Sequence, residues 1–271
     1  MGADLYRSGE TFELTMRIGI DLGGTKIEGI LMDCEGHVTE VIRRAAPREQ
    51  YDQTVQAISE LVRELDDKAD VKCPVGIGTP GTWISNRSVM KNCNSTWLNG
   101  RPLLDDLIES LSRPVRIAND ADCFALSEAV AGAGRECQCV FGIILGTGVG
   151  GGWVMNGRLR VGPNRLSGEW GHTPLPYFRS DRHTTSAEAD LPDRECYCGR
   201  ANCVETFLSG PGFSLTHRLL TGENREADAV AGSEFGERSY ALYTSMLART
   251  LAQIINVIDP DIIVCGGGIS N

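Results

Sequence analysis

The feature that most constrains this chain is a repeated unit in which an apolar strand, a glycine-rich turn and a second strand follow one another. One copy spans residues 18–31 and the other spans residues 141–155. Around them the hydrophobic pattern alternates between strand and helix periods, which predicts an α/β protein. Two related units predict two related halves facing one another, packed or hinged, with a boundary near 128–134.

The same periodicity predicts the individual elements. Strands are expected at 16–22, 26–33, 75–77, 115–118, 140–145 and 262–265, and helices at 51–67, 103–111, 122–130, 204–220 and 234–258. Asn156-Gly157 is the dipeptide of a tight hairpin. Residues 178–194 are polar and predict a loop or an insertion, either a substrate-selective lid or a solvated segment.

Charge and hydropathy exclude several classes of protein. The 271 residues include 26 Lys and Arg against 36 Asp and Glu, a net charge of −10. A chain this acidic does not attract a phosphate backbone, so nucleic acid is not an expected partner. No apolar run approaches the ~20 residues that span a bilayer, and residues 1–15 lack the apolar core of a signal peptide. A cytoplasmic protein without a membrane partner is expected.

The glycine-rich turns resemble two nucleotide-binding motifs only superficially. After Gly23-Gly24 the order is Thr25-Lys26, and a strand pattern follows instead of the helix that a P-loop requires. Residues 146–151 satisfy G-x-G-x-x-G, but a hairpin follows where a dinucleotide fold needs a helix. Both turns, with a third glycine run at 266–268, predict backbone N–H groups that surround phosphate; the alternative is that they only permit tight turns.

Asp120 is the candidate catalytic carboxylate. It follows an apolar strand and opens a predicted helix. A carboxylate there can take the proton of a hydroxyl that attacks a phosphoryl group, and with an ordinary pKa of ~3.9 it is ionised at pH 7. Asp is also favoured at helix starts as a cap. The residues alone leave both interpretations open.

Ten cysteines indicate a metal site. Cys196, Cys198 and Cys203, with His172 upstream, form a Cys₃His set that suits a closed tetrahedral zinc site. Clustered cysteines in a reducing compartment indicate metal ligands before disulfides. A lone histidine is more often a packed or surface residue, so His172 is the weaker member. The remaining cysteines are predicted to be core thiols: Cys34, Cys73, Cys93, Cys123, Cys137, Cys139 and Cys265.

Five motifs carry a family resemblance. D-L-G-G-T-K, N-D-A-D, L-G-T-G-V-G-G-G, G-E-W-G-H and C-Y-C-G-R-A-N-C-V-E, in this order, resemble the ROK family of bacterial sugar kinases over residues 16–271. The resemblance implies an actin-like, ribonuclease H-like ATPase fold with a nucleotide and sugar cleft between two domains, 16–130 and 131–271. Residues 1–15 would be an N-terminal extension. Relatives continue past residue 271, so a truncated C-terminal domain is expected, and the resemblance also implies a homodimer.

The resemblance assigns roles to individual residues. Asp120 matches the catalytic base and Asn119 a sugar ligand, and Asp21 would orient Mg²⁺. Zinc would fasten the loop carrying Glu205 to the loop carrying Glu169 without doing chemistry. Further sugar contacts are implied for Gly81, Asn94, Glu169, His172 and Glu205, and ATP phosphate contacts for Gly23, Gly24, Thr25, Lys26, Gly146, Thr147, Gly148, Val149, Gly150, Gly151, Gly266, Gly267 and Gly268.

The sequence therefore predicts a kinase that uses Mg²⁺ and ATP to phosphorylate the 6-hydroxyl of a hexose. The segment N-S-T-W-L-N-G at 94–100 is most similar to the fructokinase and mannokinase branch, so fructose or mannose is the expected substrate, and its Trp97 is the best candidate for contact with a sugar face. N-acetylglucosamine kinase is the near alternative. A non-catalytic sugar sensor or ROK-type regulator is the alternative from another class.

Overall fold

The computed structural model describes residues 16–179 and 186–270, and its contacts divide the chain into two compact units that meet at Asp120 and Ala121. The division precedes the expected boundary at 128–134. The helix α3 (Asp120–Ala131) packs on the sheet of the second unit, where Gly142 and Gly152 leave room for Ala125. The extension at 1–15 lies outside the described residues, as does part of the 178–194 segment.

The first unit is built on a five-stranded sheet in the order β3-β2-β1-β4-β7. Its strands are β1 (Met16–Leu22), β2 (Lys26–Asp33), β3 (Val38–Ala45), β4 (Val75–Thr79) and β7 (Val115–Asn119). The first three are antiparallel, whereas β4 and β7 run parallel to β1. The edge strand β3 is not predicted from the sequence, because its side chains are charged or partly exposed and show no apolar alternation.

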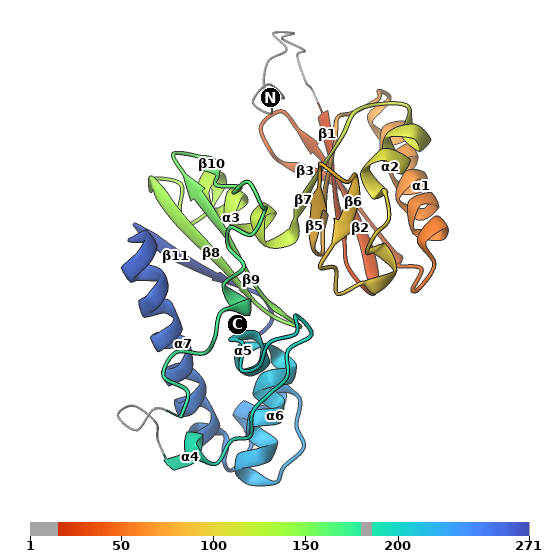
Figure 1. Cartoon of the computed structure of the whole chain (residues 1–271). Coiled ribbons are helices and arrows are strands. Elements are labelled where there is room, and N and C mark those ends of the chain that lie inside the picture. Colours follow the sequence, from red (N-terminus) through yellow and green to blue (C-terminus); the bar gives the residue numbers. More distant parts are fainter. Residues whose placement is uncertain (1–15, 180–185, 271) are drawn as a thin grey trace. The chain divides into compact units, whose positions relative to one another are not determined.

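Two helices cover one face of this sheet (Figure 1): α1 (Tyr51–Ala69) and α2 (Leu103–Leu111). Leu61 and Leu65 of α1 are fully buried, and Gly29 of β2 lets them approach the sheet because a Cβ there would lie within 3.0 Å of both. A small hairpin, β5 (Thr82–Ile84) with β6 (Val89–Lys91), and the 3₁₀ turn η1 (Thr96–Leu98) follow β4.

The second unit is built on a four-stranded sheet in the order β10-β9-β8-β11. It contains β8 (Cys139–Leu145), β9 (Val149–Met155), β10 (Arg158–Leu159) and β11 (Ile262–Gly266), with β11 parallel to β8. Asn156 and Gly157 have φ angles of 52° and 69°, which confirms the predicted tight hairpin. Both strand–turn–strand units of the sequence repeat are therefore antiparallel hairpins.

The helices of the second unit are α3, α4 (Ser186–Ala189), α5 (Glu205–Leu208), α6 (Gly210–Thr221) and α7 (Gly236–Ile258), with the 3₁₀ turns η2 (Trp170–His172) and η3 (Ala227–Gly232). The single helix predicted at 204–220 is divided in two. Ser209 caps α6 by accepting a hydrogen bond from the Gly212 N–H, and Pro211 lies in the first turn. The chain therefore changes direction directly after the helix that begins with Glu205.

Three cysteines predicted as core thiols are exposed instead: Cys34, Cys123 and Cys265. Cys34 lies in the turn after β2, Cys123 faces outward from α3, and Cys265 belongs to the edge strand β11. Cys73, Cys93 and Cys139 are buried as predicted, and Cys137 is intermediate. Among the described residues no helix is both long and apolar enough to cross a bilayer.

Candidate active site and metal centre

In the first unit, the ends of parallel strands bring the candidate residues together. Asp21 on β1 is in register with Gly78 on β4, and Thr79 on β4 is in register with Asn119 on β7. Asp21, Asn119 and Asp120 therefore lie at the same edge of one sheet. Asp120 is the first residue of α3, so the predicted strand-to-helix junction is confirmed.

Gly81 lies at this edge in a conformation that requires glycine. Its φ is +74°, and a Cβ there would lie 2.5 Å from the Lys91 carbonyl oxygen and 2.7 Å from the Cys93 nitrogen. Its own carbonyl accepts a hydrogen bond of 3.0 Å from the side-chain Nδ2 of Asn119. The backbone at Gly81 thus fixes the orientation of the amide that precedes Asp120.

The loop carrying Asn94 is held by its neighbours. Asn99 accepts from the Cys93 N–H at 2.8 Å and donates to the Cys93 carbonyl at 3.0 Å. Burial, followed by the charge of Asp120, raises the pKa of the Cys93 thiol to about 12. Cys93 is therefore a neutral buried thiol close to Asp120, and Asn94 projects from the next position along the chain. Asn99 was not identified from the sequence.

The first glycine turn closes on itself through a hydrogen bond of 3.0 Å from the Gly23 N–H to the Lys26 carbonyl. A Cβ on Gly24 would lie 3.3 Å from the Ser95 hydroxyl, so this turn packs beside the Asn94 loop. Thr25 and Lys26 are exposed. Partial burial raises the pKa of Asp21, against an opposing effect of Lys26. A bound cation would relieve the cost of the ionised Asp21, which suits a carboxylate that orients Mg²⁺.

In the second unit, Glu205 is bonded to the other glycine turn. Its Oε2 accepts a hydrogen bond of 2.9 Å from the Val149 N–H. Gly148 makes room for this carboxylate, because a Cβ at that position would lie 2.8 Å from the same oxygen. The turn itself is closed by a Gly146 N–H bond of 3.0 Å to the Gly148 carbonyl, with Thr147 exposed at its tip. Glu205 was predicted as a sugar ligand; one of its oxygens already orients the predicted phosphate loop.

The third glycine run lies beside this turn. Gly267 has a φ of +93°, and a Cβ there would lie 2.3 Å from the Leu145 carbonyl oxygen. That carbonyl accepts a 3.0 Å bond from the Ile269 N–H, and the Gly146 carbonyl accepts a 2.7 Å bond from the Gly210 N–H at the start of α6. The run at 266–268 therefore lies beside the turn at 146–151 within the second unit.

Glu169 is positioned by the segment that follows it. The Trp170 indole Nε1 donates to the Gly150 carbonyl at 2.7 Å, and a Cβ on Gly151 would lie 2.8 Å from the same indole. The turn η2 is thereby anchored on β9. His172, at the end of η2, faces the cysteine cluster.

The four predicted metal ligands come together. His172 Nδ1 lies 3.5 Å from Cys196 Sγ, and Cys198 Sγ lies 3.6 Å from Cys203 Sγ. All four ligand atoms lie within 4.8 Å of one another. Tetrahedral zinc, with Zn–S near 2.3 Å and Zn–N near 2.0 Å, requires ligand atoms roughly 3.5–3.8 Å apart. The donor set therefore suits zinc, since the His172–Cys196 and Cys198–Cys203 separations already match tetrahedral geometry.

The local backbone conformation helps the cysteine loop to bring these ligands together. Asn202, directly before Cys203, has a φ of +57°. Asn tolerates the left-handed region better than most residues. Burial raises the pKa of the Cys203 thiol to about 12. A cation is thus needed to keep this ligand as a thiolate at neutral pH.

Tyr197, between two of the cysteines, was not identified from the sequence. Its hydroxyl lies 3.0 Å from His172 Nε2, and the two rings meet edge to face with centroids 5.1 Å apart. Partial burial, together with nearby negative charges that include Glu205 and Glu169, raises the pKa of Tyr197 above its usual range. The phenol therefore lies near both carboxylates that were predicted to bind sugar.

Arg194 also escaped identification from the sequence. It is 5% exposed, and it donates to the Thr206 carbonyl at 2.7 Å and the Gly212 carbonyl at 2.9 Å. It also donates to the Thr216 hydroxyl at 2.8 Å, and burial lowers its pKa to about 10. This buried cation ties the start of the cysteine loop to α5 and α6. No local pattern marks a residue whose partners lie 12 to 22 positions away.

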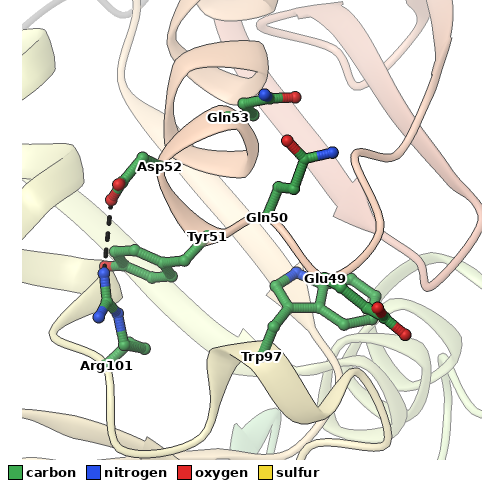
Figure 2. Close-up of a pocket in the computed structure, with 7 residues that line it drawn as sticks. All are labelled: Glu49, Gln50, Tyr51, Asp52, Gln53, Trp97 and Arg101. Atoms are coloured by element: carbon green, nitrogen blue, oxygen red, sulfur yellow. Dashed lines mark hydrogen bonds and ion pairs between the residues drawn. The ribbon is translucent and has the colours of Figure 1, made fainter.

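A cavity of about 500 Å³ lies in the first unit at the start of α1 (Figure 2). The Arg101 guanidinium stacks on the Tyr51 ring with a distance of 4.0 Å to its centroid and pairs with Asp52 at 3.4 Å. Trp97 forms part of the wall and donates from Nε1 to the Thr54 hydroxyl at 3.3 Å. The cavity thus contains Trp97, the predicted aromatic sugar contact, but none of the residues predicted for catalysis or phosphate binding.

The comparisons with known proteins agree with these motifs. Residues 17–271 match the ROK family, and the chain belongs to that family. It is 39% identical over 261 residues to an N-acetyl-D-glucosamine kinase of Citrobacter koseri, covering 94% of this chain and 85% of that relative. A ROK hexokinase from Thermus thermophilus superposes with a TM-score of 0.78 at 27% identity, covering 94% of this chain and 82% of that structure. A ROK glucokinase from Streptomyces griseus, solved with glucose and AMPPNP, gives a TM-score of 0.74 at 27% identity, covering 94% and 84%.

The fold and the family together define the class. The chain is a ROK family sugar kinase with the actin-like ATPase fold, which confirms the family and fold predicted from the sequence. A kinase of this class uses ATP and Mg²⁺ to phosphorylate a sugar. The similar N-acetylglucosamine kinase corresponds to the near alternative predicted from the sequence, and the fructose or mannose preference stays a prediction.

Proposed function

We propose that this protein transfers the γ-phosphoryl group of Mg-ATP to the 6-hydroxyl of N-acetylglucosamine. The observation that carries the proposal is the pairing of Asn119 and Asp120 at the end of β7, in a chain 39% identical to an N-acetylglucosamine kinase. A carboxylate directly after a strand end, next to an amide fixed by Gly81, can receive a sugar hydroxyl in one orientation.

Asp120 is the proposed general base. The oxygen at C6 attacks the γ-phosphorus, the bond from that phosphorus to the bridging β–γ oxygen breaks, and the products are the sugar 6-phosphate and ADP. The hydroxyl proton passes to the carboxylate of Asp120. Asn119, Asn94 and the Gly81 backbone are proposed to hold the sugar on the first unit, and Glu169, His172 and Glu205 are proposed to do so on the second.

The glycine runs are proposed to bind the phosphates. The turns at 23–26 and 146–151 and the run at 266–268 are rich in glycine, so their backbone can approach an anion closely, with the exposed side chains of Thr25, Lys26 and Thr147 beside it. Bound Mg²⁺ would bridge phosphate oxygens and neutralise their charge. Asp21 is the residue proposed to orient it, since burial raises the pKa of this carboxylate and a bound cation would offset the cost of its ionised form.

Zinc is proposed as a structural ion held by His172, Cys196, Cys198 and Cys203. The fit of the ligand separations to tetrahedral zinc supports this proposal. A fully occupied site of four protein ligands has no open position for a substrate. Zinc would therefore fasten η2 to the loop before α5 and so fix Glu169 relative to Glu205. The implied homodimer stays a prediction.

Fructose or mannose is the second candidate substrate. It is favoured by the segment N-S-T-W-L-N-G at 94–100, whose Trp97 lines the cavity of the first unit. A non-catalytic sugar sensor would keep the same residues and bind without turnover.

One assay separates these candidates. ADP release is measured with Mg-ATP against N-acetylglucosamine, fructose, mannose and glucose in parallel, with a no-sugar control. We expect the highest kcat/KM for N-acetylglucosamine. A higher value for fructose or mannose would favour the second candidate. Sugar binding by calorimetry without ADP release from any sugar would contradict the kinase proposal and favour the sensor.

A further inference from the structure

We propose that the hydroxyl of Tyr197 binds the sugar beside His172, so that the metal-binding loop itself takes part in sugar recognition. This inference rests on the proposed function and extends it to a residue that neither the motifs nor the comparisons assign.

Tyr197 is held where a sugar ligand would be useful. It lies between the ligands Cys196 and Cys198, so metal binding fixes its backbone on both sides. The residue is 69% exposed, yet its hydroxyl is 3.0 Å from His172 Nε2 and its ring meets the imidazole edge to face. The exposed ring leaves the phenol open to a ligand from solvent, while the imidazole holds its position.

The tautomer of His172 sets the direction of the phenol proton. Nδ1 faces Cys196 at 3.5 Å and would use its lone pair for the metal. Nε2 then carries the ring proton and donates it to the Tyr197 oxygen. The phenol proton is therefore directed away from the imidazole, toward an acceptor outside this pair.

A sugar hydroxyl oxygen is the acceptor that fits this environment. Glu169 and Glu205, both near the phenol, are acceptors only when ionised and would take the protons of sugar hydroxyls. A sugar hydroxyl that donates to one carboxylate still has lone pairs for the Tyr197 proton. Because the outer nitrogen of His172 is occupied by Tyr197, the sugar contact proposed for His172 would run through the phenol, which is the donor at this corner.

A purely structural role makes a different prediction. If Tyr197 only orients the metal-bound imidazole, its removal lowers metal affinity, typically 10–100-fold for such outer partners. If Tyr197 binds sugar, its removal lowers sugar affinity and leaves the metal in place. Sugar binding and metal content therefore distinguish the two roles.

The test compares Tyr197→Phe with Tyr240→Phe, a partly buried tyrosine of α7 that packs edge to face on Phe213. Calorimetry on the zinc-loaded protein measures the Kd for N-acetylglucosamine, fructose and mannose without nucleotide. We expect Tyr197→Phe to weaken binding of the preferred sugar by about three- to tenfold, the effect of one neutral hydrogen bond. The control Tyr240→Phe should match the parent protein in zinc content, kcat and sugar affinity, and Tyr197→Phe should keep its zinc.

Unchanged or tighter sugar binding in Tyr197→Phe would overturn the inference, as would loss of zinc that accounts for the weaker binding. The failure of the proposed function has a different signature. In that case the parent protein releases no ADP with any sugar, while the binding comparison of the two phenylalanine variants still decides whether Tyr197 contacts the sugar.

Discussion

Both units use the same local device, a glycine turn between antiparallel strands, but they hold their candidate residues in different ways. In the first unit, Asp21, Asn119 and Asp120 are placed by the register of parallel strands, which is backbone hydrogen bonding. In the second unit, Glu205 and His172 are placed by side chains: a carboxylate on a backbone N–H, a metal-ligand cluster and a buried arginine. The second group therefore depends on a metal-ligand cluster and on a few individual contacts, whereas the first depends on the sheet as a whole.

The largest expected effect comes from Asp120→Asn. The amide cannot take the hydroxyl proton, so kcat should fall by about 10²–10⁴-fold, while sugar affinity changes little. ADP release and calorimetry measure the two quantities. Asp122→Asn, on the same helix, is the matched control and should keep its turnover. Unchanged turnover in Asp120→Asn would remove this residue from the proton transfer.

Removing the metal should affect the second unit alone. Cys203→Ser deletes a buried ligand, and we expect loss of bound zinc and a fall in unfolding temperature on the order of 10 °C. Hydrogen exchange should rise around 169–208 and not in the first sheet. Cys73 is a buried thiol of the first unit, and the control variant Cys73→Ser should bind zinc like the parent protein. An equal rise in hydrogen exchange in both sheets would contradict the expectation that only the second unit depends on the metal.

Arg194→Met tests the second fastening of the cysteine loop. The change removes the guanidinium donor from two carbonyl oxygens and a hydroxyl, which should lower the free energy of unfolding by about 1–3 kcal/mol. Denaturant unfolding of the zinc-loaded protein measures this free energy. Arg218→Met, an exposed arginine on α6, should change stability by no more than about 0.5 kcal/mol. Equal effects of the two variants would show that Arg194 does not hold the loop.

A pair of glycines separates backbone strain from close packing in the first unit. Gly81 and Gly100 have φ angles of +74° and +75°, but a Cβ would have neighbours within 4 Å at Gly81 and none at Gly100. In both alanine variants the left-handed conformation should lower the free energy of unfolding by about 1–2 kcal/mol. Gly81→Ala should lose more and should also weaken sugar binding, as measured by unfolding and calorimetry. Identical losses would mean that the close approach to Lys91 is not limiting.

The smallest effect is a pH-dependent one at Asp21. Because its pKa is raised in the folded protein, its contribution to stability is present below its ordinary pKa and is lost as pH rises through the folded value. Asp21→Asn stays neutral, so at pH 7 it should unfold about 1–2 °C higher than the parent. This gain should vanish near pH 3, while Mg²⁺-dependent turnover falls.

The control for this effect has the opposite sign. A hydrogen bond from the His37 backbone N–H lowers the pKa of Asp33. Asp33→Asn should therefore lower the unfolding temperature at pH 7, with the loss fading at low pH. If Asp21→Asn were destabilising at pH 7 in thermal unfolding, the carboxylate would be satisfied in the folded protein and would need no cation.

The motifs with local causes could be predicted from the sequence. The hairpin at Asn156-Gly157 and the helix start at Asp120 depend on residues next to one another, and both are confirmed. The spacing of Cys196, Cys198 and Cys203 predicts a cluster for the same reason, and the structure brings it together with His172. The edge strand β3 was not predicted, because a half-exposed strand has no apolar pattern to mark it.

Periodicity, glycine positions and contiguous motifs were enough to establish the α/β class, the two hairpins and the family, because each of these has its cause within a short stretch of chain. Only the tertiary structure shows that Glu205 orients a glycine turn, that Arg194 is buried among carbonyls and that the Tyr197 hydroxyl contacts His172. The physical reason is that these contacts join residues 12 to 56 positions apart. Their energies depend on burial and on distance in space, which no local pattern in the chain records.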